Sequence, residues 1–187
     1  METTKSIKQL PMVISKPTAL RTIKLIIIHC SATRIDRDFT AKDVDTAHRY
    51  LGYSCWGYHY YIRKDGKVEK MRNEIDKGAH CFGHNAESIA ICYEGGLDEN
   101  SKPADTRTVK QVIAMHDLIR ELWTRYPGAA VLGHRDLSPD RNHNGIIERF
   151  ERIKECPCFD VITEMRMIES NVDLKSVHPT FRVIVQL

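Results

Sequence analysis

Residues 24–33 read Lys-Leu-Ile-Ile-Ile-His-Cys-Ser-Ala-Thr. The run from Leu25 to Ile28 is apolar without a break and rich in β-branched side chains, which is typical of a strand buried on both faces of a parallel sheet. The run is far too short to cross a membrane. His29 follows it directly, so a polar side chain lies at the carboxyl end of a predicted central strand.

A helix is predicted next, over residues 40–51. Thr40 is a suitable N-cap, and Asp43, three residues later, completes an acidic variant of the capping box. Gly52 ends the helix, since glycine adopts the left-handed backbone conformation at low cost.

The rest of the chain alternates between strand and helix patterns. Lys64-Asp65-Gly66 is a turn signal and predicts a β-hairpin between strands at residues 58–62 and 67–71. The other predicted elements are strands at 88–93 and 129–132, helices at 105–126 and 160–169, and a strand-like segment at 181–185. This order predicts one α/β domain with a mixed central β-sheet flanked by helices.

The helix at 105–126 has a candidate core face at helical spacing. Its members are Val109, Val112, Ile113, His116, Ile119, Leu122, Trp123 and Tyr126. The ordinary explanation of such a stripe is packing against the sheet.

The chain divides into an N-terminal arm (1–22), one domain (23–170) and a C-terminal tail (171–187). A length of 187 residues, with 42% hydrophobic and 28% charged residues, fits one well-buried core. We expect the tail to be too short to form a separate domain.

The net charge of +3 is mild, and no stripe of basic residues with interleaved aromatics is present, so a nucleic-acid partner is not expected. We expect no membrane span and no secretory signal peptide, and therefore synthesis in the cytoplasm. In a reducing compartment the six cysteines would be thiols, and Cys30, Cys81 and Cys92 fit small buried apolar positions.

Two histidines and one cysteine lie where apolar runs end or loops turn: His29, His134 and Cys156. Zinc prefers these ligand types, and three protein ligands leave one position open, as in catalytic sites. The spacing is not a specific zinc pattern, and no His-Glu-x-x-His helix is present. Each histidine alone would more often be a hydrogen-bonded core residue.

Between Lys24 and Glu169 the chain resembles the zinc-dependent N-acetylmuramoyl-L-alanine amidase family of the bacteriophage-lysozyme type, whose fold is shared by peptidoglycan recognition proteins. The strings that carry the resemblance occur in the expected order: HCSAT, GYHYYIRKDGKVEK, GAHCFGHNAESIAICYEGG, GHRDLSPD and KECPCFD. The resemblance implies a zinc ion held by His29, His134 and Cys156, and peptidoglycan as the substrate.

The resemblance also implies roles for four further residues. Tyr58 and Lys154 match the family's catalytic positions, where they would stabilise the oxyanion and serve the leaving amine. His80 and Asn85 match positions that line the substrate groove. Without the resemblance, Tyr58 would be a strand-face aromatic, Lys154 a solvated charge and His80 a structural residue.

Residues 140–151 have the spacing of a calcium-binding loop. Asp140, Asn142 and Asn144 supply oxygens at positions 1, 3 and 5, Gly145 stands at position 6 and Glu151 at position 12. The alternative is a turn rich in Asp and Asn that caps the following segment. The spacing therefore predicts calcium as a second cofactor, beside zinc, without excluding a plain turn.

Two functions from different classes follow. The first is zinc-dependent hydrolysis of the amide bond between N-acetylmuramic acid and L-alanine, causing cell-wall lysis as in a prophage endolysin. The second is a muropeptide-binding module of the same fold without activity, which the presence of Cys156 disfavours. An enzyme without a signal peptide would reach the cell wall through a holin or another export system.

Overall fold

The structure is a computed structural model that describes residues 21–171. Its centre is a five-stranded sheet in the order β4–β3–β5–β1–β7. The strands are β1 (Leu25–Cys30), β3 (Tyr60–Ile62), β4 (Val68–Lys70), β5 (Ser88–Tyr93) and β7 (Ala130–Gly133). Only β4 runs antiparallel to its neighbour, and the other pairs in this sheet are parallel. The predicted mixed sheet, including the hairpin, is confirmed.

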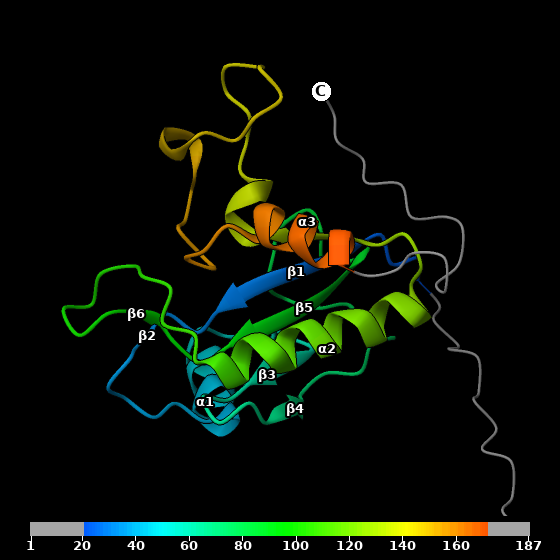
Figure 1. Ribbon diagram of the computed structural model, residues 1–187. Helices are drawn as coiled ribbons and strands as arrows, with labels where there is room; N and C mark the ends of the chain where they lie inside the picture. Colours follow the sequence, from blue (N-terminus) through cyan, green and yellow to red (C-terminus); the bar gives the residue numbers. More distant parts are fainter. Residues whose placement is uncertain (1–20, 172–187) are drawn as a thin grey trace, which may run out of the picture.

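The two faces of the sheet are covered by different helices. Successive side chains of a strand point to opposite faces, so Ile26 and Ile28 share one face while Ile27 and His29 share the other. The first face packs against α2 and α3, and the second carries a smaller cluster that includes Val44 of α1. Figure 1 shows α2 and α3 lying along β1 and β5. The side chain of His29 therefore lies on the same face of the sheet as α1.

The helix α1 (Ala41–Tyr50) begins and ends where the sequence predicts. The Thr40 hydroxyl accepts from the backbone N–H of Asp43 at 3.3 Å, and the Asp43 carboxylate accepts from the N–H of Thr40 at 2.7 Å. The two bonds form the predicted capping box, which satisfies backbone donors at the start of the helix. Gly52 follows with a φ of +87°.

The long helix α2 (Val109–Arg125) differs from its prediction in both start and face. It begins after the N-cap Thr108, and Val109 and Ile113, both assigned to the core, are 76% and 56% exposed. The buried face instead includes Gln111, whose amide donates to the carbonyls of Ile62 (3.1 Å) and Glu94 (2.9 Å). The predicted residues Ile119, Leu122, Trp123 and Tyr126 are buried as expected. The N-terminal part of the predicted face is wrong, because a fully paired amide is buried there and a count of apolar residues does not find it.

The remaining elements are short or lie near the described ends. They are the two-stranded sheet β2 (Thr33–Arg34) with β6 (Gly96–Leu97), the 3₁₀ helices His134–Leu137 and Arg149–Glu151, and the helix α3 (Val161–Asn171). The predicted helix at 160–169 is confirmed. The strand-like segment at 181–185, most of the N-terminal arm and nearly all of the tail lie outside the described residues.

No helix among residues 21–171 is long and apolar enough to cross a lipid bilayer.

Candidate metal centre

Adjacent strands bring the two predicted histidine ligands together. β1 and β7 are parallel, with Ile28 opposite Gly133. His29 and His134 each follow one of these residues, so they lie at the same edge of the sheet. Their rings are 4.7 Å apart between centroids. This is the carboxyl edge, where parallel α/β sheets place their sites.

Cys156 comes from a distant loop and is fixed from both sides. Its sulfur accepts from the N–H of Cys30 at 3.3 Å, and its carbonyl accepts from the N–H of Arg135 at 2.8 Å. Both donors are the residues that directly follow the two histidines. The loop is therefore tied to the ends of β1 and β7, which brings Cys156 to the histidine pair.

The three donor atoms fit a metal ion of the zinc type. The ligand atoms of His29, His134 and Cys156 all lie within 4.8 Å of one another, and Nδ1 of His29 is 3.8 Å from the Cys156 sulfur. Around a tetrahedral zinc ion, nitrogen and sulfur ligands lie roughly 3.4–3.6 Å apart. A contraction of roughly 1.4 Å or less between ligand atoms would close the group around an ion. The cluster thus agrees with the ligand set that the sequence predicts.

The imidazole of His29 is kept neutral, which is the form that binds metal ions. Only 1% of its surface is exposed. Burial lowers the pKa of His29 well below its usual value, and the nearby His80 and His134 lower it further. The imidazole is therefore neutral, with a lone pair available for a metal.

Tyr58 lies directly against the first ligand. Its ring is 5.1 Å from the ring of His29, and its hydroxyl lies near the buried thiol of Cys92. Burial raises the pKa of Tyr58 well above its usual value. The phenol thus keeps its proton at neutral pH, which makes it a hydrogen-bond donor rather than a base.

Lys154 lies on the exposed loop between Arg149–Glu151 and Cys156. Its positive charge is one of the causes that lower the pKa of His29, which places the ammonium group within electrostatic reach of the cluster. The position fits a cation at the mouth of the site, and its predicted catalytic role stays a prediction.

His80 and Asn85 make hydrogen bonds inside the protein. Nδ1 of His80 is 3.0 Å from Nε2 of His29. The amide oxygen of Asn85 accepts from the N–H groups of His80 (2.9 Å) and Cys81 (3.0 Å). Asn85 therefore supports the loop, and His80 lies behind the ligand His29. Their predicted contact with substrate stays a prediction.

His48 is a site neighbour that the sequence analysis did not single out. It lies on α1 four residues after Val44, and its Nδ1 accepts from the N–H of Gly57 at 2.9 Å. Its ring is 5.1 Å from that of Tyr58. The helical spacing from Val44, the buried residue of α1, was the signal that places His48 toward the sheet.

His59, also not singled out, is fully buried beside the cluster. Its Nδ1 accepts from the N–H of Ala90 at 2.9 Å, and its Nε2 lies 3.0 Å from the carbonyl of Asp76. Its ring is 5.9 Å from that of His80. Sequence alone gives no signal for these backbone contacts, because they depend on the pairing of β3 with β5.

The hydroxyl groups of Ser31 and Thr33 support the loop after His29. They are 2.7 Å apart, and Ser31 accepts from the N–H of Gly95 at 3.0 Å. This bond joins the loop after β1 to the end of β5, so the ligand strand is anchored just past the ligand.

The candidate calcium loop satisfies its carboxylates internally. Asp140 accepts from the N–H groups of His143 (2.7 Å) and Gly145 (2.8 Å). Glu151 accepts from the N–H groups of Arg141 (2.7 Å) and Glu148 (2.9 Å). Such bonds are typical of a turn rich in Asp and Asn, which was the alternative to a calcium-binding loop. They give calcium no support, and calcium stays a prediction of the spacing alone.

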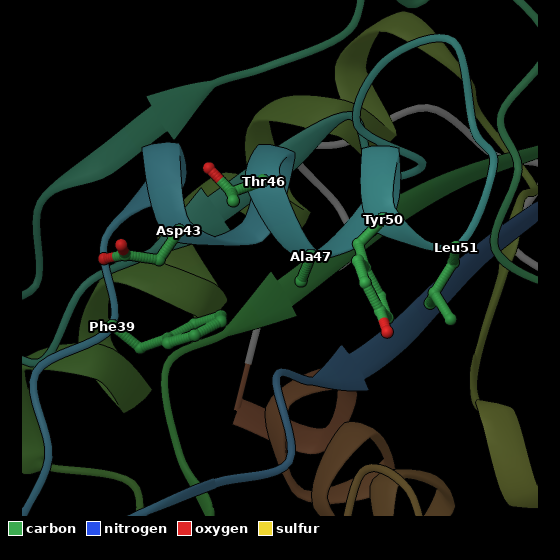
Figure 2. Close-up of a pocket in the computed structure, with 6 residues that line it drawn as sticks. All are labelled: Phe39, Asp43, Thr46, Ala47, Tyr50 and Leu51. Carbon is green, nitrogen blue, oxygen red and sulfur yellow. The ribbon is translucent and has the colours of Figure 1, made fainter.

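A shallow pocket lies on α1, apart from the ligand cluster. Figure 2 shows its lining residues: Phe39, Asp43, Thr46, Ala47, Tyr50 and Leu51. Tyr50 and Leu51 are 93% and 67% exposed, so the pocket is open to solvent. The lining includes none of the predicted site residues.

Known proteins resemble this chain in sequence and in fold. Residues 19–157 match the family described as N-acetylmuramoyl-L-alanine amidase. The endolysin of Klebsiella phage KP32 is 34% identical over 136 residues, which cover 73% of this chain and 81% of that protein. The solved structure of N-acetylmuramoyl-L-alanine amidase LysC from Clostridium intestinale URNW is 28% identical with a TM-score of 0.61, covering 81% of this chain and 87% of LysC. Drosophila PGRP-LB, at 22% identity and a TM-score of 0.57 over 89% of this chain and 87% of its own, shares the fold. The chain belongs to the N-acetylmuramoyl-L-alanine amidase family.

Proposed function

We propose that this chain hydrolyses the amide bond between N-acetylmuramic acid and L-alanine in peptidoglycan, and that it uses zinc to do so. The observation that carries the proposal is the convergence of His29, His134 and Cys156 at one edge of the sheet, with donor atoms within 4.8 Å. Family membership supports the reaction, and the endolysin relatives support the cell wall as the place of action.

His29, His134 and Cys156 would hold the zinc ion and leave one coordination position for a fourth ligand. When bound there, zinc supplies Lewis acidity that polarises the substrate carbonyl and lowers the pKa of a water molecule. The protein keeps His29 neutral by burial, so this ligand needs no deprotonation before it binds.

Tyr58 is proposed to donate a hydrogen bond to the carbonyl oxygen of the scissile amide as negative charge develops on it. Burial keeps the phenol protonated, and contact with the rings of His29 and His48 fixes its orientation. A preorganised donor of this kind typically contributes about 10²–10³-fold in rate.

Lys154 is proposed to serve the leaving group. When the C–N bond breaks, the amine of L-alanine must gain a proton, and a cation beside it favours the departure. Lys154 is exposed on the loop that leads to Cys156, so its flexible side chain can approach a substrate from solvent. Its charge lies near enough to the ligand cluster to affect His29.

The second candidate is a muropeptide-binding module of the same fold without activity; the likeness to PGRP-LB shows that fold and does not distinguish the two candidates. A binding module has no need for a thiolate ligand. In this chain Cys156 is oriented toward His29 by two backbone hydrogen bonds. The fixed orientation of this third ligand favours the enzyme over the binding module. Delivery to the wall by a holin or another export system stays a prediction.

The test is digestion of purified peptidoglycan followed by mass spectrometry of the products. The proposal expects new L-alanine amino groups without new reducing sugar ends. Cys156→Ala should release neither product, whereas the matched control Cys55→Ser, at a half-buried cysteine that contacts Arg72, should cut like the wild type. Reducing ends without amino groups would mean another bond is cut. Bound muropeptides without any product would favour the binding module.

A further inference from the structure

A chain of hydrogen bonds leads from the backbone to the side of His29 that faces away from Cys156. The Ser88 hydroxyl oxygen is 2.7 Å from the carbonyl oxygen of His84 and 3.2 Å from Nε2 of His80. Nδ1 of His80 is in turn 3.0 Å from Nε2 of His29. This series of hydrogen bonds therefore ends on Nε2 of His29, the ring nitrogen that does not face Cys156.

The positions of the protons along this chain follow from its first member. A carbonyl oxygen only accepts, so the Ser88 hydroxyl donates its single proton to His84. Ser88 then accepts from Nε2–H of His80, and a neutral His80 offers a bare Nδ1 to His29. His29 consequently donates from Nε2–H. Its lone pair is on Nδ1, 3.8 Å from the Cys156 sulfur.

Both imidazoles must be neutral for this arrangement, and the surroundings favour that. His80 and His29 lie edge to face with ring centroids 5.0 Å apart, and a second positive charge so close would be unfavourable. The two nitrogens that face each other are 3.0 Å apart, so only one of them carries a proton, and the hydrogen bonds from Ser88 place that proton on Nε2 of His29.

The fold holds both Ser88 and the loop that carries His80 in place. Ser88 is the fully buried first residue of β5 and pairs with Leu25 of β1. Asn85 holds the loop that carries His80 by accepting from the N–H groups of His80 and Cys81. The His80 ring thus keeps a fixed place behind His29.

We propose that Ser88 and His80 are positioning residues that hold His29 in the tautomer and orientation in which Nδ1 binds the metal. The inference rests on the proposed function for the identity of the metal. It gives His80 a role behind the ligand in place of contact with substrate, and it assigns Ser88, which no sequence motif singled out.

The first test measures zinc affinity in competition with a chromophoric chelator. His80→Ala removes the acceptor for His29 and should weaken zinc binding by about 10–100-fold, the usual effect of losing a group that orients a ligand. His80→Asn keeps an acceptor oxygen near the place of Nδ1 and should restore most of the affinity. Ser88→Ala frees His80 to change tautomer and should weaken binding less than His80→Ala. His84→Ala, which leaves the accepting carbonyl in place, should bind zinc like the wild type.

The second test reads the tautomers directly in the metal-free protein labelled with ¹⁵N-histidine. Long-range proton–nitrogen NMR spectra should show protonated Nε2 and bare Nδ1 for both His29 and His80. In Ser88→Ala the His80 signals should shift toward a mixture of tautomers. A structural role for Ser88 alone would leave these signals unchanged.

Two outcomes would overturn the inference: zinc affinity of His80→Ala equal to that of the wild type, or an Asn variant as weak as the Ala variant with the metal-free fold intact by circular dichroism. Neither readout involves hydrolysis. A wild-type protein that binds zinc tightly and cuts no amide would contradict the proposed function while leaving the positioning role in place.

Discussion

On the face of the sheet toward α2 and α3, the parallel strands present apolar side chains such as Ile28 and Ile91, which are fully buried against Leu122 and its neighbours. On the face toward α1, the same strands carry His29 and Ser88, which are buried as deeply but are polar. One strand, β1, contributes to both. The first face is stabilised by removal of apolar surface from water, and the second requires a hydrogen-bond partner for every polar group.

The apolar face thus contributes mainly to stability, and the polar face of the same sheet carries the candidate metal ligand His29. A buried neutral histidine is tolerated on the α1 face when both ring nitrogens have partners, as the bonds of His59 to Ala90 and Asp76 illustrate. Substitutions on the two faces should therefore change different observables, and the following predictions test that separation.

The largest effect is expected from Leu122→Ala on the apolar face. Truncation of this fully buried side chain should lower the free energy of unfolding by about 2–5 kcal/mol. Chemical denaturation of the purified variant measures the change. Cleavage per folded molecule should stay at the wild-type level, because Leu122 packs on the face of the sheet opposite to His29.

The matched control is Ile113→Ala on the same helix. Ile113 is 56% exposed, although the sequence pattern assigned it to the core. Its truncation should change the free energy of unfolding by no more than about 0.5 kcal/mol. Equal losses at Leu122 and Ile113 would contradict the observed face of α2.

The second prediction concerns pH. Burial lowers the pKa of His59 to about 4, below its unfolded value of about 6.5, so the unfolded chain binds more protons between these values. The contribution of His59 to stability is thus fully present above pH 6.5 and is lost as the pH falls to 4. The loss is on the order of 3 kcal/mol.

Urea unfolding of the metal-free protein at several pH values measures this slope, and His59→Asn, which keeps an acceptor for the N–H of Ala90, should reduce it by the His59 share while His29 and His80 keep theirs. On the opposite face, burial tends to raise the pKa of Glu164, but its bonds to His116 and Arg107 outweigh this and lower it to about 2. That contribution is present above about pH 4.5 and is lost only below it. A wild-type slope confined to the range below pH 4.5 would contradict the buried neutral histidine.

The smallest effect in free energy is expected for Tyr58→Phe. The ring contacts with His29 and His48 stay, and only the donated hydrogen bond is lost. The rate of amide cleavage should fall about 10²-fold, or about 2.7 kcal/mol, with zinc affinity unchanged. Steady-state kinetics on a soluble muropeptide measure it. An unchanged rate would remove Tyr58 from the catalytic group.

The sequence predicted the apolar face better than the polar one. Local sequence patterns predicted two features correctly. The uninterrupted apolar run from Leu25 to Ile28 forms a buried strand, and Thr40 and Asp43 form the capping box. The buried face of α2 was wrong in part, because the burial of Gln111 depends on carbonyls of two distant strand ends.

On the polar face, residue types indicated the candidate metal ligands, whereas the spacing of these residues along the sequence did not. The ligands His29, His134 and Cys156 were identified and come together as expected. The support from Ser88 was not, since a buried serine at the start of a strand has no distinctive pattern. Its role depends on the loop that carries His80 folding back over β1, a contact across 51 residues.

The measurement that tests the central claim most directly is amide cleavage by the wild-type protein after complete removal of metal with a chelator and stepwise return of zinc. The account predicts that release of L-alanine amino groups stops with the metal and recovers fully at one zinc ion per chain, while Cys156→Ala recovers nothing. Cleavage that continues in the metal-free protein would contradict the claim that the edge of the sheet on the α1 side is a zinc centre for hydrolysis.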